Sequence, residues 1–184
     1  MAQTESTMLA LGTKAPDFKL MDTISGEQIT LDQCKGLVGT VVMFICNHCP
    51  FVKHVNKELV RMAKDYKSKG IDFVAISSND VEKYPQDSPE KMKETATNEE
   101  YLFPYLYDAT QDVAKAYKAA CTPDFFVFDD QLLLVYRGQL DDSRPGNGIP
   151  VTGKDIRNAL DAIIEGKAVS EIQKPSIGCN IKWK

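Results

Sequence analysis

The sequence lacks the features of a membrane-spanning, secreted or nucleic-acid-binding protein. Its longest apolar run, residues 41–45, is far too short to cross a bilayer. The first residues contain neither the basic cluster nor the apolar stretch of a secretory signal, so we expect a cytoplasmic protein with no membrane partner. The net charge of -4 at pH 7 argues against a nucleic-acid partner, which requires a basic face.

Internal repeats, low-complexity tracts and proline-rich linkers are also missing. The chain has 184 residues, 43% of them hydrophobic and 26% charged, which is typical of one soluble globular domain. We therefore predict a single domain over residues 1–184. Within it, we expect a loose N-terminal arm at 1–12 and a C-terminal tail without periodicity at 167–184.

Cysteines are few, and their number is odd. The five are Cys34, Cys46, Cys49, Cys121 and Cys179. An odd count in a chain of this length does not suggest the disulfide framework of a small secreted protein. Two cysteines separated by two residues instead indicate redox chemistry or metal binding.

Hydrophobic periodicity predicts an α/β fold. Alternating segments predict an N-terminal β-hairpin, and a continuously apolar segment followed by a long amphipathic helix predicts a βαβ unit. Thr152 and Asp155 suggest a capping box for the last helix. The expected strands are 15–20, 28–31, 37–45, 71–76, 105–107, 124–128 and 132–136, and the expected helices are 50–69, 88–99, 112–120 and 154–166. A crossover followed by a late hairpin implies a mixed central sheet flanked by helices.

The motif Cys46-Asn47-His48-Cys49 lies between the buried strand and the long helix. A sulfur at a helix N-terminus is close to free backbone N–H groups, which favour the thiolate. His48 adds a basic group, and residues 35–57 include no acidic side chain. We predict that Cys46, at the exposed end of the motif, attacks a disulfide and that Cys49 resolves the product. The alternative is a non-enzymatic module that holds zinc through Cys46, Cys49 and Cys121.

Four other residues each have two possible interpretations. Pro123 precedes a predicted strand, and its peptide bond is either cis or a simple trans boundary. Cys121 and Cys179 are either accessory redox thiols or buried apolar residues. Arg144, in a polar loop, either contacts an anionic substrate group or belongs to a solvated connection.

Three separated motifs resemble the thioredoxin-like superfamily. They are residues 12–20 (GTKAPDFKL), the Cys-x-x-Cys motif at 46–49, and residues 122–128 (TPDFFVF) followed by 134–138 (LVYRG). The chain is most similar to the AhpC/TSA, peroxiredoxin-related branch of thiol-disulfide oxidoreductases. The resemblance implies a thioredoxin-like fold, a role in cell redox homeostasis with antioxidant activity, and no cofactor.

The same resemblance assigns roles to residues around the motif. It implies that Pro123 is cis and packs opposite Cys46, and that the Thr122 backbone pairs with the substrate chain. Asn47 and His48 resemble the central dipeptide of strongly oxidising members. The implied partners are a disulfide-containing protein or a small-molecule thiol, and a reductant such as thioredoxin, glutathione or a reductase.

Two departures from the family pattern bear on function. The peroxiredoxin pattern Pro-x-x-x-Thr-x-x-Cys is absent, so a thiol-dependent peroxidase is the second candidate activity. The strand before Cys46 also lacks the buried acid that assists the resolving thiol in thioredoxins, which leaves His48 or water to transfer the proton.

Overall fold

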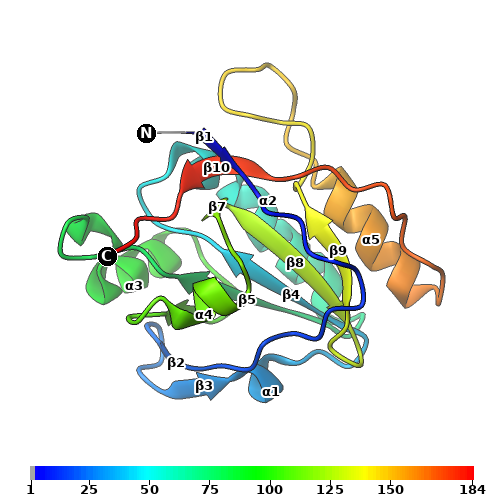
Figure 1. Cartoon of the computed structure of the whole chain (residues 1–184), viewed down its shortest axis with the longest axis horizontal. Helices are drawn as coiled ribbons and strands as arrows, with labels where there is room; N and C mark the ends of the chain where they lie inside the picture. The colour runs from blue at the N-terminus through cyan, green and yellow to red at the C-terminus, as the bar shows by residue number, and fades with distance from the viewer. Residues whose placement is uncertain (1–2) are drawn as a thin grey trace.

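The most apolar segment of the chain forms the central strand of a mixed sheet. In the computed structural model, which describes residues 3–184, strand β4 (Gly39–Phe44) is buried along its whole length. It pairs in parallel with β5 (Ile71–Ser77) and antiparallel with β8 (Asp124–Asp129). The seven strands follow the order β3-β2-β6-β5-β4-β8-β9, which confirms the predicted mixed sheet (Figure 1).

The remaining elements complete this sheet, cover it or form a second, smaller sheet. The strands are β1 (Gln3–Glu5), β2 (Lys19–Asp22), β3 (Gln28–Thr30), β6 (Tyr105–Tyr107), β7 (Cys121–Thr122), β9 (Leu134–Gly138) and β10 (Ile177–Asn180). The helices are α1 (Leu31–Cys34), α2 (Pro50–Lys67), the 3-10 turn η1 (Pro85–Asp87), α3 (Pro89–Asn98), α4 (Asp112–Ala116) and α5 (Lys154–Ile164).

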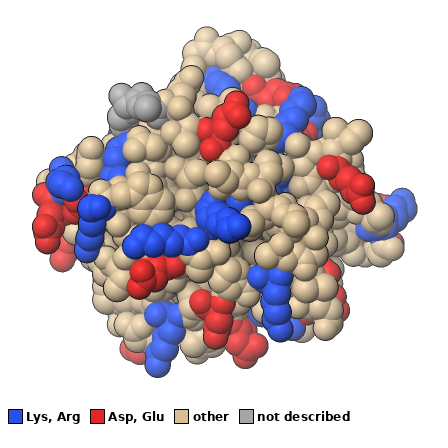
Figure 2. Space-filling view, in the orientation of Figure 1, with Lys and Arg blue, Asp and Glu red and all other residues tan. Residues whose placement is uncertain are grey.

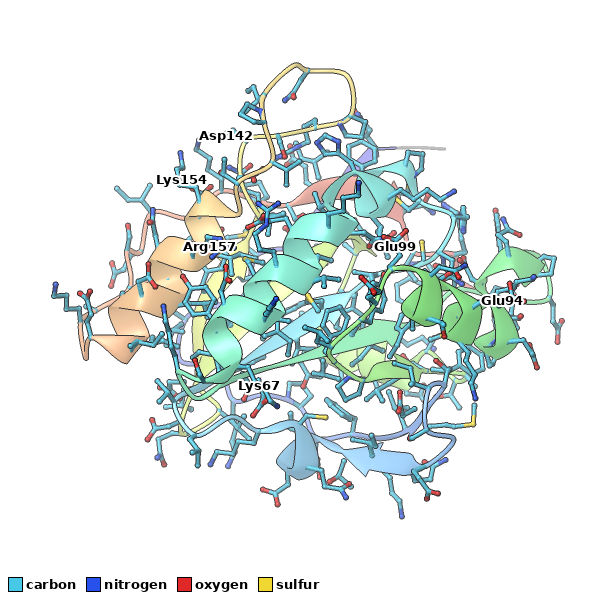
Figure 3. All side chains as sticks on the ribbon, turned by 180° about the vertical axis from the view of Figure 1, so that it is seen from behind. Lys67, Glu94, Glu99, Asp142, Lys154 and Arg157 are labelled. Atoms are coloured by element: carbon cyan, nitrogen blue, oxygen red, sulfur yellow. The ribbon has the colours of Figure 1, made fainter. Side chains whose placement is uncertain are left out.

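Alternation along β4 divides the apolar core into two layers. Val41 and Met43 face one cluster, which includes buried residues of α2, α3 and α5. Val42 and Phe44 face a second cluster, which includes residues of α1 and α4. Figure 3 shows α2 and α5 side by side on one face of the sheet, where Arg157 of α5 reaches acidic residues of α2. This arrangement follows from the period of two in side-chain direction along a strand.

Both ends of the chain meet in the smaller sheet. Its order is β1-β10-β7, and all its pairs are antiparallel. Figure 1 shows β1 and β10 lying together beside β7 at one end of the large sheet. Strand β10 is therefore held between β1 and β7, the strand that precedes Pro123.

Several predicted boundaries were wrong. Residues 3–5 form β1 instead of a loose arm, and residues 1–2 lie outside the described part of the chain. The first hairpin strand is 19–22, not 15–20, because Ala15 and Phe18 turn into the core before pairing begins. The tail also contains β10, whose four residues are too few to produce a periodic signal.

The last helix begins as expected, but the predicted capping box does not form. Gly153, with φ of +67°, occupies the N-cap position, where no side chain is available to cap the helix. The carboxylate of Asp141 replaces the box by accepting hydrogen bonds of 2.7 Å from the backbone N–H groups of Thr152 and Gly153. Asp155 instead accepts a hydrogen bond from Gln139.

Charges on the surface are mixed. Figure 2 shows basic and acidic side chains interspersed across one face, which differs from the basic stripe of a nucleic-acid-binding surface. Within residues 3–184, no helix has the length and apolar content needed to span a membrane.

Candidate active site

The two motif cysteines lie at the junction of β4 and α2. Cys46 follows the last residues of β4, and Cys49 occupies the N-cap position of α2, immediately before Pro50. The Cys49 side chain makes no capping hydrogen bond to the helix, and the first turn of α2 contains no acidic residue. The predicted strand-to-helix placement is therefore confirmed.

Both sulfurs are buried, contrary to the expectation that Cys46 is exposed. Cys46 is 2% exposed and Cys49 is 0% exposed. The cover comes partly from Thr122, whose Oγ1 lies 3.4 Å from Cys46 Sγ and whose carbonyl oxygen lies 3.2 Å from Cys49 Sγ. A substrate therefore reaches these sulfurs only through a narrow approach or after a local movement.

The Cys46–Cys49 pair loses its first proton at a lower pH than an isolated thiol does. A hydrogen bond from Cys46 lowers the pKa of Cys49 to about 5, although burial opposes the change. Hydrogen bonds from Cys179 and the Val52 backbone favour the Cys49 thiolate further. The hydrogen bond to Cys49 and the burial of the thiol together raise the pKa of Cys46. The sequence placed the lowered pKa on Cys46, whereas the structure places it on Cys49, at the helix end.

An acid from a distant segment is bound to the centre of the motif. Asp87, at the end of η1, lies 2.6 Å from Nδ1 of His48 through one oxygen. Its other oxygen accepts the backbone N–H groups of Asn47 and His48, at 2.9 and 3.3 Å. Asn79 donates to Asp87 at 2.8 Å. Burial raises the Asp87 pKa, but hydrogen bonds from His48 and Asn79 outweigh it and hold the pKa below its usual value.

Two tyrosines fix the remaining parts of the motif. Tyr84 stacks on the His48 ring, with centroids 5.5 Å apart and an angle of 8° between the planes. Tyr105 donates through its hydroxyl to Asn47 Oδ1 at 3.0 Å. The dipeptide between the cysteines is therefore held by contacts from η1 and β6.

Asp87, Asn79, Tyr84 and Tyr105 are site residues that the sequence analysis missed. None lies near the motif in sequence, and residues 35–57, which surround Cys46, contain no acidic side chain. The one available signal was Asp87 itself, a lone acid in a short segment between Pro85 and Pro89.

The peptide bond between Thr122 and Pro123 is cis, which confirms the reading that the resemblance favoured. The Thr122 backbone was expected to be free for a substrate chain. Instead, it pairs with Cys179 of β10, because the chain's own tail occupies that edge of β7. The structure therefore brings Cys179 to the motif.

The other candidate residues lie farther from the two sulfurs. Cys121 is buried, and its sulfur contacts the Pro123 carbonyl at 3.6 Å. Arg144 holds its own loop closed by donating to the carbonyl oxygens of Asp141 and Ser143 and to Gln139 Oε1. We find no bond from Arg144 to the motif in the described part of the chain.

The ligand set expected for zinc does not assemble. In residues 3–184, the group of cysteine, histidine and acidic side chains close enough to share an ion is Cys46, His48 and Asp87, with donor atoms within 4.8 Å of one another. Neither Cys49 nor Cys121 belongs to it. The proposed zinc module through Cys46, Cys49 and Cys121 is therefore not supported.

The chain is similar to several known proteins. The profile of the AhpC/TSA family matches residues 11–137. The chain is 28% identical over 126 residues to the thiol-disulfide oxidoreductase ResA of Geobacillus kaustophilus, covering 68% of this chain and 67% of that protein.

Solved structures of two similar proteins cover nearly the whole chain. An uncharacterized conserved protein from Geobacillus kaustophilus is 64% identical, with a TM-score of 0.98, over 100% of this chain and 97% of that one. A hypothetical protein from Sinorhizobium meliloti 1021 is 50% identical, with a TM-score of 0.96, over 98% of both chains.

A more distant structure identifies the fold. A putative thiol:disulfide interchange protein from Chlorobium tepidum is 20% identical, with a TM-score of 0.67, over 85% of this chain and 99% of that one. With the strand order and the cis-proline, this match confirms the predicted thioredoxin-like fold.

Proposed function

Because the chain belongs to the AhpC/TSA family, we propose that it is a thiol-disulfide oxidoreductase whose redox pair is Cys46 and Cys49. The observation that carries the proposal is that Cys46 and Cys49 lie at the N-terminus of α2, where both sulfurs contact Thr122 and the pKa of Cys49 is lowered to about 5. The named function of the ResA relative supports the same chemistry.

The attacking sulfur is Cys46. Cys46 lies before α2, beside His48, whereas Cys49 occupies the N-cap position of the helix, and Thr122 contacts both sulfurs. When the shared proton passes from Cys46 to Cys49, Cys46 becomes the thiolate. It then attacks a substrate disulfide, forms a mixed disulfide and releases one substrate thiolate.

The second step regenerates the free substrate. Cys49 attacks the Cys46 sulfur of the mixed disulfide, and its proton passes to the departing substrate thiolate. The products are a Cys46–Cys49 disulfide, one substrate thiol that carries the Cys49 proton, and the substrate thiolate released in the first step, which takes a proton from solvent. A thiol reductant reverses the change in the protein, and oxidation of a substrate dithiol is the same sequence run backwards.

His48 and Asp87 have a positioning role in this scheme. Asp87 orients the imidazole through Nδ1, and its charge acts on Cys46, whose pKa it helps to raise after the larger effects of Cys49 and burial. This acid occupies a different place from the buried acid of thioredoxins, which sequence analysis did not find in the strand before Cys46.

A redox titration tests the proposal. The full chain carrying Cys179→Ala, which removes the neighbouring third thiol, is equilibrated with reduced and oxidised glutathione. Alkylation and peptide mapping then measure the Cys46–Cys49 disulfide. We expect one two-electron transition, and its absence in the Cys179→Ala/Cys49→Ser variant. Failure to form the bridge at any glutathione ratio would refute the proposal, and formation of a Cys46 sulfenic acid with peroxide, followed by turnover with a thiol reductant, would favour the peroxidase alternative.

A further inference from the structure

The C-terminal strand brings a third thiol to the redox pair. In β10, Cys179 lies directly opposite Thr122, the residue that contacts both motif sulfurs. Cys179 is 4% exposed and packs in the same apolar cluster as Cys46 and Cys49. The Cys179 thiol also acts on Cys49, whose pKa it helps to lower. Three sulfurs from two distant parts of the chain therefore meet at one place.

Hydrogen bonds on both sides hold Cys179 there. Before it, the Ser176 hydroxyl donates to the Pro123 carbonyl at 2.7 Å. After it, the Lys182 backbone N–H donates to Asn79 Oδ1 at 2.8 Å. Asn79 is also a partner of Asp87 in the motif network. The tail is therefore fixed to the same groups that position the motif.

The residue before Cys179 permits the close approach of the two strands. A Cβ at Gly178 would overlap the carbonyl oxygen of Thr122, so only glycine fits without a shift of one strand. A side chain at this position would move Cys179 away from the motif.

Cys121 is also nearby, but it is placed differently. Its sulfur is directed to the Pro123 carbonyl, and the charges of Asp124 and Arg137 act on it. Of these two thiols, Cys179 is the one that lowers the pKa of Cys49, and it is the one paired with Thr122, which contacts both motif sulfurs. Cys179 is therefore the preferred partner for exchange with Cys49.

We propose that Cys179 attacks the Cys46–Cys49 disulfide at Cys49, forming a Cys49–Cys179 disulfide and releasing Cys46. The inference rests on the proposed function, which supplies the first disulfide. The oxidising equivalents then remain in the protein while Cys46 is free to react with another substrate.

The exchange balances without an external reagent. The Cys179 sulfur forms one S–S bond to Cys49 as the bond between Cys49 and Cys46 breaks. The electron pair of the broken bond leaves on Cys46, which takes up the proton given up by Cys179. One disulfide and one thiol are present before and after the step. In the reduced protein, burial and the hydrogen bond to Cys49 raise the pKa of Cys179 to about 12; the second of these is lost once Cys49 is oxidised.

Trapping the second bridge tests the proposal. The full chain carrying Cys46→Ser is oxidised with oxidised glutathione, alkylated and mapped by mass spectrometry. We expect an intramolecular Cys49–Cys179 disulfide. It should persist in Cys46→Ser/Cys121→Ala and be lost in Cys46→Ser/Cys179→Ala, where Cys49 should carry glutathione or remain a thiol. Cys179→Ser, which is closer in size, provides a second variant in case alanine disturbs the tail.

The oxidised wild-type protein provides an independent measurement. Exchange leaves a fraction of Cys46 as thiol, so iodoacetamide should label Cys46 in the wild type and not in Cys179→Ser, where Cys46 stays bridged to Cys49. This inference alone would be overturned if the Cys46–Cys49 bridge forms in Cys179→Ala but no Cys49–Cys179 bridge forms in Cys46→Ser. Absence of both bridges would overturn the proposed function and this inference with it.

Discussion

Replacement of Asp87 should destabilise the protein and, at the same time, make Cys46 more reactive. The Asp87 side chain is completely buried, and its carboxylate accepts four hydrogen bonds: two from backbone N–H groups, one from His48 and one from Asn79. Asp87→Ala leaves these donors without their acceptor. Asp87→Asn keeps the shape and one oxygen but removes the charge and turns an amide group toward other donors.

The expected loss of stability follows from those contacts. Leaving a buried donor without its acceptor costs about 1–3 kcal/mol, so we expect a loss of about 4 kcal/mol for alanine, which strands four donors. We expect a smaller loss of about 2 kcal/mol for asparagine, comparable to one hydrogen bond to a charged group. In a chain of this size each kcal/mol shifts the Tm by roughly 2–4 °C, so Asp87→Ala should melt about 10 °C lower. Urea unfolding measures both variants.

The stabilising contribution of Asp87 should decrease as the pH falls. The folded-state pKa of Asp87 is lowered, so its stabilising contribution is present above the unfolded-state pKa and is lost as pH falls through the folded-state value. The stability difference between the wild type and Asp87→Asn should therefore shrink on acidification from neutral pH. A difference that stays constant or grows would contradict the assigned ionisation.

The reactivity of Cys46 should increase in the Asp87 variants, whereas their stability should decrease. The Asp87 charge contributes to the raised pKa of Cys46, so its removal should speed alkylation of Cys46 at a fixed pH. Cys34, buried in the cluster on the other face of the sheet, reports any gain due to general opening of the fold. Faster labelling of Cys46 without faster labelling of Cys34 is expected. Unchanged stability together with unchanged Cys46 reactivity would refute the reasoning.

Three further changes test other parts of the structure. Arg137→Met should cost about 3–5 kcal/mol in urea unfolding, because it leaves buried Asp124, 3.0 Å away, without its counter-charge; adding Asp124→Asn should restore part of this. Gly178→Ala should cost about 1–3 kcal/mol through overlap with the β7 backbone, and faster hydrogen exchange confined to β10 would locate the effect. Cys46→Ala should raise the pKa of Cys49 above about 5, measured by thiolate absorbance, whereas Cys46→Ser keeps a donor and should raise it less.

The parts of the fold that sequence predicted best are those with repeated local signals. The amphipathic helix expected at 50–69 is α2, whose buried face includes Val52, Val55, Leu59 and Met62 at helical spacing. The helix ends at Lys67, two residues before the expected end at 69, and Gly70, with φ of +80°, lies between it and β5. The strand-to-helix junction at the two cysteines followed from the same signals.

The parts that sequence missed depend on contacts between distant segments. β10 has four residues, and Gly178 is understood only once the Thr122 carbonyl is seen opposite it. Asp87 has no neighbouring pattern that relates it to His48. The burial of Cys46 likewise depends on Thr122, which is remote in sequence.

Asn79 connects the two features that the sequence did not reveal. Its amide nitrogen donates to Asp87, which orients His48, and its amide oxygen accepts from Lys182, which follows the strand carrying Cys179. One side chain therefore helps to fix both the charge beside Cys46 and the third sulfur beside Cys49. Asn79 lies just beyond the C-terminal end of β5, which is parallel to β4, so Asn79 and the motif lie at the same edge of the sheet. The redox chemistry that we propose accordingly depends on the ordering of the tail as well as on the Cys-x-x-Cys motif.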